Sequence, residues 1–178
     1  EYAGLLDMLT GSDRILLARV GDLGEDGPGD KLRVAIRHDV DHDLPAAMKL
    51  AEMERERQAP ASYYIHHASY YYGWLGDDGV FHRYEAAGEC YRRLELGGAE
   101  VGLHTDPLWF YQQGVDGAAA LAEELAWLRS VGLDVRGTSA HGSAPYYGAE
   151  NFEIFAERRL EGPDRVTIAG EEVSLGLL

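Results

Sequence analysis

The spacing of four apolar segments constrains the fold of this chain more than any other feature. The segments begin near residues 32, 62, 99 and 133, and helix-like patterns separate them. Spacings of about 30 to 37 residues are typical of right-handed strand–helix–strand units, which build a parallel sheet. The sequence therefore predicts a single α/β domain over residues 1–178, with a mostly parallel sheet.

The boundaries of the expected elements follow from hydrophobic periodicity and from capping residues. We expect strands at 14–20, 32–38, 62–67, 99–104 and 133–142, a loop at 68–79, and helices at 2–9, 43–58, 80–96, 116–132 and near 149–157. Asp43 is the expected N-cap of its helix, with Pro45 in the first turn. Residues 1–30 are expected to be an N-terminal extension. Residues 144–178 are less regular, with a possible hairpin at 165–175 that turns at Ala169–Gly170.

Composition excludes several classes of partner. The 178 residues include 16 basic and 31 acidic ones, a formal net charge of −15, so the chain lacks the basic surface that nucleic acids need. No apolar run reaches the ~20 residues of a membrane span, and no signal-peptide pattern opens the chain. Cys90 is the only cysteine, so no disulfide forms within the chain. We expect a cytoplasmic protein, and the oligomeric state stays open.

Polar side chains gather where each predicted strand ends. In chain order they are Asp39 and Asp41, His66 and His67, His104 and Asp106, and His141. In α/β barrels and open α/β sheets, the carboxyl ends of parallel strands form one shared rim, where active sites lie. We therefore expect these residues, which are distant in sequence, to lie together.

The densest polar stretch is RVAIRHDVDHD. Side chains two apart on a strand share a face, so Asp39 and Asp41 point the same way, with Arg37 below them. His38 and His42 then point the other way and take supporting roles, such as orienting a carboxylate. The alternative interpretation is a polar turn in which the aspartates serve turns and helix caps.

Imidazoles and carboxylates on one rim predict a divalent cation such as Zn²⁺, with Co, Ni or Mn as alternatives. Two or three protein ligands would leave an open position for a water molecule whose pKa the metal lowers. A second carboxylate would take the proton of that water. His66 and His67 are neighbours, so at most one of them faces the site. His82, inside a predicted helix, is expected to be a packing or surface residue.

Aromatic side chains follow the second and third of these strand ends. They occur in the stretches ASYYYGW and LWFY, which include Tyr72 and Trp109. Packing in the core and stacking on sugar rings are equally open for them. We take His67, Tyr72 and Trp109 as candidate substrate-binding residues.

Four segments, in their order and spacing, resemble the polysaccharide deacetylase superfamily, also called the NodB-homology or carbohydrate esterase family 4 group. They are AIRHDVDHDLPAAMKLAEME (35–54), ASYYIHH (61–67), AEVGLHTDPL (99–108) and VRGTSAHGS (135–143). The first resembles the branch that has RHDVD in place of TFDDG. The resemblance implies a distorted or incomplete (β/α) barrel. It also implies metal-dependent hydrolysis that removes an N-acyl or O-acyl group from a sugar or glycan precursor.

The resemblance also implies roles for individual residues. By position, Asp39 matches the catalytic base, Asp41 and His104 match metal ligands, and His141 resembles the general acid. The implied reaction uses a metal-activated water, from which Asp39 takes a proton, and ends when His141 protonates the leaving amine.

One position departs from the family pattern. Four residues after His104, where a second metal-binding histidine is expected, this chain has Leu108. A third ligand must then come from Asp106, His141 or a histidine of the second strand. We take Asp106 as the candidate.

Two other functions are compatible with the same residues. The chain could be a non-catalytic carbohydrate-binding barrel with a degenerate metal site. It could also be another metallohydrolase, acting on a phosphoester or a cyclic amide, although no basic phosphate cradle is visible in the sequence.

Overall fold

The computed structural model describes residues 1–24 and 29–142, together with the backbone of 165–168 and 171–174. Its helices are α1 (Tyr2–Thr10), the 3₁₀ helix η1 (Val20–Asp22), α2 (Leu44–Glu56), α3 (Glu85–Leu96), α4 (Pro107–Gln112) and α5 (Gly117–Ser130). Its strands are β1 (Ile15–Ala18), β2 (Leu32–Val40), β3 (Ala61–His66), β4 (Gly73–Leu75), β5 (Phe81–Arg83), β6 (Glu100–Thr105), β7 (Thr138–Ala140), β8 (Arg165–Ile168) and β9 (Glu171–Ser174).

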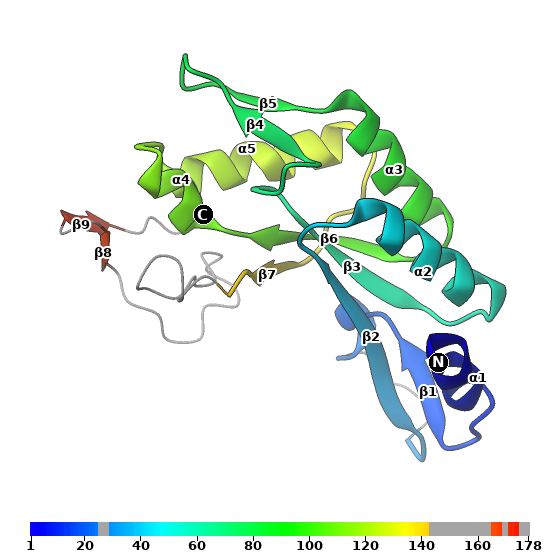
Figure 1. The fold of residues 1–178 in the computed structure, drawn as a ribbon. Coiled ribbons are helices and arrows are strands. Elements are labelled where there is room, and N and C mark those ends of the chain that lie inside the picture. The colour runs from blue at the N-terminus through cyan, green and yellow to red at the C-terminus, as the bar shows by residue number, and fades with distance from the viewer. Residues whose placement is uncertain (25–28, 143–164, 169–170, 175–178) are drawn as a thin grey trace.

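Five parallel strands form one sheet in the order β1-β2-β3-β6-β7. Figure 1 shows this sheet curling strongly, like half of a barrel, with α2, α3 and α5 along one side of it. The predicted α/β fold with a mostly parallel sheet is thus confirmed. The curl is consistent with the expected distorted barrel.

Residues 1–30, expected to be an extension, contribute an edge strand to this sheet. β1 pairs in parallel with β2, beginning with Ile15 opposite Leu32. The turn after β1 is fixed by buried Glu100 of β6, whose Oε2 accepts a hydrogen bond of 3.1 Å from the backbone N–H of Gly21. The N-terminal segment is therefore part of the same unit as the rest of the sheet.

Aspartate caps set the starts of two long helices. The side chain of Asp43 accepts a 2.8 Å hydrogen bond from the N–H of Ala46, and Pro45 lies in the first turn of α2. Asp116 accepts in the same way from Ala118, at 3.0 Å, at the start of α5. These bonds satisfy N–H groups that have no partner inside the helix. The predicted cap at Asp43 is confirmed.

The predicted helix at 80–96 is wrong in its first turn. Residues Phe81–Arg83 instead form β5, which pairs antiparallel with β4, and α3 begins only at Glu85. Trp74 lies opposite His82 across this hairpin, and the two rings stack with their centroids 5.1 Å apart. Such cross-strand ring pairs stabilise strand pairing and here override the helix-like pattern.

The C-terminal predictions are met in part. The strand expected at 133–142 is shorter, because 133–137 form an irregular connection in which Leu133 and Val135 are buried. The hairpin expected at 165–175 is confirmed in its strands, since β8 pairs antiparallel with β9. Its predicted turn at 169–170 and the helix near 149–157 lie outside the described residues.

The hydrophobic core lies on the side of the sheet that the helices cover. Its large buried members include Tyr63, Ile65, Tyr91, Leu94, Val101, Leu103, Leu121 and Leu128. Tyr63 and Ile65 alternate along β3 with Tyr64 and His66, which therefore point to the opposite side of the sheet. That opposite side carries the polar residues described below.

A buried carboxylate joins the β4–β5 hairpin to α5. Glu124 accepts two hydrogen bonds from Arg83, at 2.7 and 2.6 Å, and a third from the hydroxyl of Tyr72 at 2.7 Å. The side chain of Glu124 is only 1% exposed, so its charge depends on these partners. The hairpin is consequently held against the helix layer.

Candidate functional site

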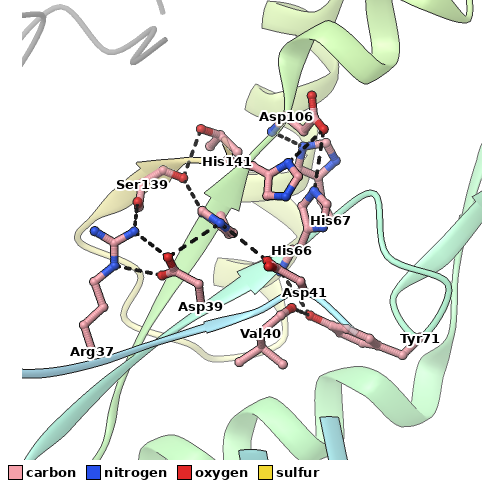
Figure 2. A network of polar contacts seen from close by, with 12 residues as sticks. Arg37, Asp39, Val40, Asp41, His66, His67, Tyr71, Asp106, Ser139 and His141 are labelled. Carbon is pink, nitrogen blue, oxygen red and sulfur yellow. Dashed lines mark hydrogen bonds and ion pairs between the residues drawn. The ribbon is translucent and has the colours of Figure 1, made fainter. Parts of the chain in front are cut away.

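The carboxyl ends of four neighbouring strands bring the predicted polar residues into one cluster (Figure 2). The contributors are Asp39 and Asp41 from the end of β2, His66 from β3, His104 from β6, and His141 just after β7. The strand register places His66 beside His104, and His104 beside Ser139. Residues that are distant in sequence are therefore adjacent in space.

Asp39 is held by a forked contact with Arg37. Nε and Nη2 of Arg37 each lie 2.8 Å from an oxygen of Asp39. The guanidinium group also lies 5.0 Å above the ring of Tyr64, and its Nη2 donates to the hydroxyl of Ser139. The side chain of Asp39 is 36% exposed. This carboxylate is thus oriented by Arg37 and can be reached by a water molecule.

His104 is oriented by the backbone of β7. Its Nδ1 lies 2.8 Å from the carbonyl oxygen of Ser139, and a carbonyl can only accept, so the hydrogen is on Nδ1. The lone pair is then on Nε2, which lies 3.5 Å from Oδ1 of Asp41 and 3.8 Å from Oδ2 of Asp39. Burial lowers the pKa of His104 below its usual range, which favours the neutral imidazole that binds metals.

His141 faces a buried carboxylate. Its Nδ1 lies 3.3 Å from Oδ2 of Asp106, a side chain that is 2% exposed. The hydrogen bond to Asp106 raises the pKa of His141 above its usual range. The other oxygen of Asp106 accepts a 3.0 Å bond from the N–H of Trp109 at the start of α4. Asp106 therefore fixes both the ring of His141 and the beginning of a helix.

Atoms that can bind metal meet in two groups. In the first, Asp41, His104 and His141 each place one such atom within 4.8 Å of the other two. In the second, His66, Asp106 and His141 do the same. Of the predicted ligands Asp41, His104 and Asp106, the first two lie in one group with His141 as its third member, and Asp106 lies in the other group.

Leu108 supplies no ligand. Its side chain is fully buried on α4, four residues after His104. His141, from another strand end, lies beside His104 with the ring centroids 5.1 Å apart. The third ligand-type side chain beside Asp41 and His104 thus comes from a different part of the chain than the family pattern implies.

Of the two neighbouring histidines, His66 stacks directly on a member of the cluster. Its ring stacks on that of His141, with the centroids 4.2 Å apart. His67 stacks instead on Phe110, and its Nε2 accepts a 2.7 Å bond from the N–H of Asp106. Burial lowers the pKa of His67 to about 3. A fully buried ring with these partners does not fit the substrate contact that we predicted for His67.

The two predicted aromatic contacts differ in their surroundings. Tyr72 is fully buried, and its hydroxyl is bound to Glu124, so it is a core residue and its predicted contact with substrate does not fit. Trp109 is half-buried and packs edge-on against Phe81 and Phe110, with centroid distances of 6.1 and 5.1 Å. Contact of Trp109 with a substrate stays a prediction.

Tyr71 is a residue of the site that the sequence did not single out. Its hydroxyl donates to the carbonyl of Val40 at the end of β2 and accepts a 3.1 Å bond from the N–H of His66 (Figure 2). Burial raises the pKa of Tyr71 above its usual range, so the hydroxyl keeps its proton. Three consecutive tyrosines gave no sign of which one joins the strand ends.

His38 points away from Asp39, as the strand alternation predicts. Its Nε2 lies 2.6 Å from Oε1 of Glu54, and its ring stacks on Tyr63 with the centroids 4.6 Å apart. Buried Glu54 also accepts hydrogen bonds from the hydroxyls of Tyr63 and Tyr2. His38 therefore contacts a carboxylate, but on the side of the sheet that faces the helices.

A cavity of 680 Å³ lies between α2 and α3, next to Ala61 at the start of β3 and Ala99 just before β6. These positions are at the amino ends of the strands, opposite to the cluster of Figure 2. The cavity is therefore not part of the candidate site.

Comparisons with known proteins gave no match: neither a family model, nor a curated protein, nor a solved structure is similar to the chain. Among the described helices, none is long and apolar enough to cross a membrane.

Proposed function

We propose that this chain is a metal-dependent hydrolase that removes an N-acyl group from a sugar. The observation that carries the proposal is the position of Asp39 beside a set of metal-binding atoms. Its Oδ2 lies 3.8 Å from Nε2 of His104, which in turn lies 3.5 Å from Oδ1 of Asp41. A proton acceptor next to a cation site is the arrangement that hydrolysis with an activated water requires.

The residues of the first group fit a divalent cation. Oδ1 of Asp41 is buried and has no hydrogen-bond partner among the described residues. His104 carries its hydrogen on Nδ1, and Nδ1 of His141 faces Asp106, so each ring is oriented by an acceptor, as is usual for metal-binding histidines. One carboxylate and two imidazoles suit Zn²⁺ or a similar ion. Such an ion would polarise an acyl carbonyl and lower the pKa of a water molecule.

Asp39 moves the proton in the proposed reaction. It accepts a proton from water as the water oxygen forms a bond to the acyl carbon, while Arg37 keeps the carboxylate oriented. The C–N bond then breaks, and Asp39 returns the proton to the leaving amine. This assignment gives Asp39 both proton steps and gives His141 the place of the third ligand, instead of the general acid that the resemblance implies.

The sugar is proposed on two grounds. The first is the resemblance of four sequence segments to polysaccharide deacetylases. The second is an exposed aromatic ring in the segment after β3, since Tyr70 is 72% exposed and packs edge-on against Tyr71, with the ring centroids 6.2 Å apart. An aromatic ring in this position offers an apolar face on which a sugar can stack.

The test is acetate release from N-acetylglucosamine oligomers by protein loaded with Zn²⁺ or Co²⁺. Asp39→Asn is expected to keep its cation content and lose turnover, whereas His104→Ala is expected to lose the cation at Asp41. Asp43→Asn is the matched control, because asparagine caps a helix as well as aspartate does, and it should retain full activity.

Two results would overturn the proposal. Full acetate release by Asp39→Asn would remove Asp39 as the base. Binding of the oligomers without acetate release by any metal-loaded form would instead make the chain a non-catalytic carbohydrate-binding protein.

A further inference from the structure

The second group of metal-binding atoms surrounds one oxygen of Asp106. Oδ2 of Asp106 lies 3.3 Å from Nδ1 of His141 and 3.7 Å from Nε2 of His66. The three side chains come from the ends of β3 and β6 and from the residue after β7. They share only His141 with the first group.

The surroundings of the His66 ring point to a ligand. The residue is 7% exposed, and neither of its ring nitrogens has a hydrogen-bond partner among the described residues. Its Nε2 faces Asp106 at a distance too long for a hydrogen bond. Buried polar atoms are normally paired, so a buried imidazole of this kind calls for a partner.

The distances match those of a metal site. In a tetrahedral zinc site with bonds of about 2.0–2.2 Å, neighbouring ligand atoms are about 3.3–3.6 Å apart. The two distances from Asp106, 3.3 and 3.7 Å, are close to this value. The first group has a similar separation of 3.5 Å between Asp41 and His104.

We propose that His66 Nε2, Asp106 Oδ2 and His141 Nδ1 bind a second divalent cation, separate from the one at Asp41 and His104. On binding, the cation replaces the hydrogen on Nδ1 of His141, and one proton leaves to solvent. This proposal goes beyond the proposed function, because a cation can bind at the second position whether or not the chain hydrolyses a substrate.

His141 couples the two positions. Each position has two ligands of its own, His66 and Asp106 in one case and Asp41 and His104 in the other, while His141 belongs to both. Removing a ligand that belongs to one position should therefore empty that position alone. Removing His141 should weaken cation binding at both positions.

The experiment counts bound cations. Metal-free protein is titrated with Zn²⁺ by calorimetry, and the bound metal is measured by elemental analysis after desalting. The unchanged chain is expected to bind two equivalents, and both His66→Ala and His104→Ala are expected to bind one. His141→Ala should weaken both binding steps at least tenfold.

Two further variants make the count decisive. His66→Phe keeps a ring that can stack on His141 but offers no nitrogen, so a folded His66→Phe chain should also bind one equivalent. His82→Ala removes a half-buried histidine of the β4–β5 hairpin that belongs to neither group, and it should leave both equivalents.

If the unchanged chain binds a single equivalent of Zn²⁺ and His66→Phe binds it as well, the second site is refuted. Two equivalents retained by His66→Phe would also overturn it. Loss of one equivalent in His66→Phe, together with no acetate release by any form, would refute the hydrolase and leave the second cation site standing.

Discussion

Arg37 and Asp39, two residues apart on β2, form a forked ion pair in which both N–O distances are 2.8 Å. Their side chains are 43% and 36% exposed, so the pair contributes at most about 1 kcal/mol to stability. Orientation is the larger consequence, because the fork fixes the plane of the Asp39 carboxylate beside His104.

Replacing Arg37 by lysine should therefore reduce turnover without unfolding the protein. Lysine keeps the charge but cannot contact both oxygens in one plane. We expect kcat for acetate release to fall about tenfold or more, with the cation content and melting temperature unchanged. Arg92→Lys, in an exposed pair with Glu89, is the control and should retain full kcat. An Arg37→Lys variant with unaltered kcat would contradict the orienting role.

Gly102→Ala tests the packing of Tyr64 beneath the Arg37–Asp39 ion pair. A Cβ at Gly102 would lie 2.6 Å from a ring carbon of Tyr64 and 2.9 Å from the carbonyl oxygen of Gly137. Because Tyr64 lies under Arg37, we expect lower activity and about 1–3 kcal/mol less stability in urea unfolding. Gly4→Ala on α1, where a Cβ meets nothing within 4 Å, should leave stability unchanged or raise it by about 0.5–1 kcal/mol. Equal stability of the two variants would show that the sheet adjusts freely at Gly102.

Acid stability should depend on His67. Burial lowers its folded-state pKa from 6.5 to about 3, so the unfolded chain takes up a proton first as the pH falls. His67 therefore leaves the free energy of unfolding unchanged above about pH 6.5. Between about pH 6.5 and about pH 3 it lowers this free energy by no more than about 1.4 kcal/mol per pH unit. Urea unfolding of metal-free His67→Gln at pH 4.5 and 7.5 should show a smaller difference than the unchanged chain. A difference of the same size would assign the acid sensitivity to other groups.

The contact between Arg83 and Glu124 should stabilise the fold rather than the chemistry. Arg83→Met leaves the 1% exposed carboxylate of Glu124 without its cation, and we expect a loss of about 3–5 kcal/mol in unfolding free energy. Adding Glu124→Leu to this variant should recover part of the loss, because it removes the uncompensated charge. Arg92→Met, at the surface, should change stability by no more than about 0.5 kcal/mol. Arg83→Met with native stability would contradict the stabilising role of this contact.

Local periodicity was sufficient to predict one half of the site. The two-residue alternation of a strand placed Asp39 and Asp41 on one side and His38 on the other, and the regular spacing of strand–helix units brought His104 and His141 to the same rim. The same alternation along β3 would have favoured His66, which shares a side with Tyr64. The sequence alone predicts that at most one of His66 and His67 faces the site and does not tell which.

Features that depend on tertiary contacts could not be predicted. Asp106 was expected to share a site with Asp41 and His104, but its position as the cap of α4 turns it toward His141 and His66. The β5 strand at Phe81–Arg83 is held by the pairing of His82 with Trp74 and by the bonds of Arg83 to Glu124, neither of which has a local sequence signal.

The parallel register of β3, β6 and β7 links metal binding to folding. A slip of one residue in β6 would turn His104 toward the helices, so the proposed ligands converge only in the native pairing. A cation that binds this state alone adds about 2.7 kcal/mol of stability at a concentration 100 times its dissociation constant. The supply of metal would then shift the balance between folded and unfolded chain.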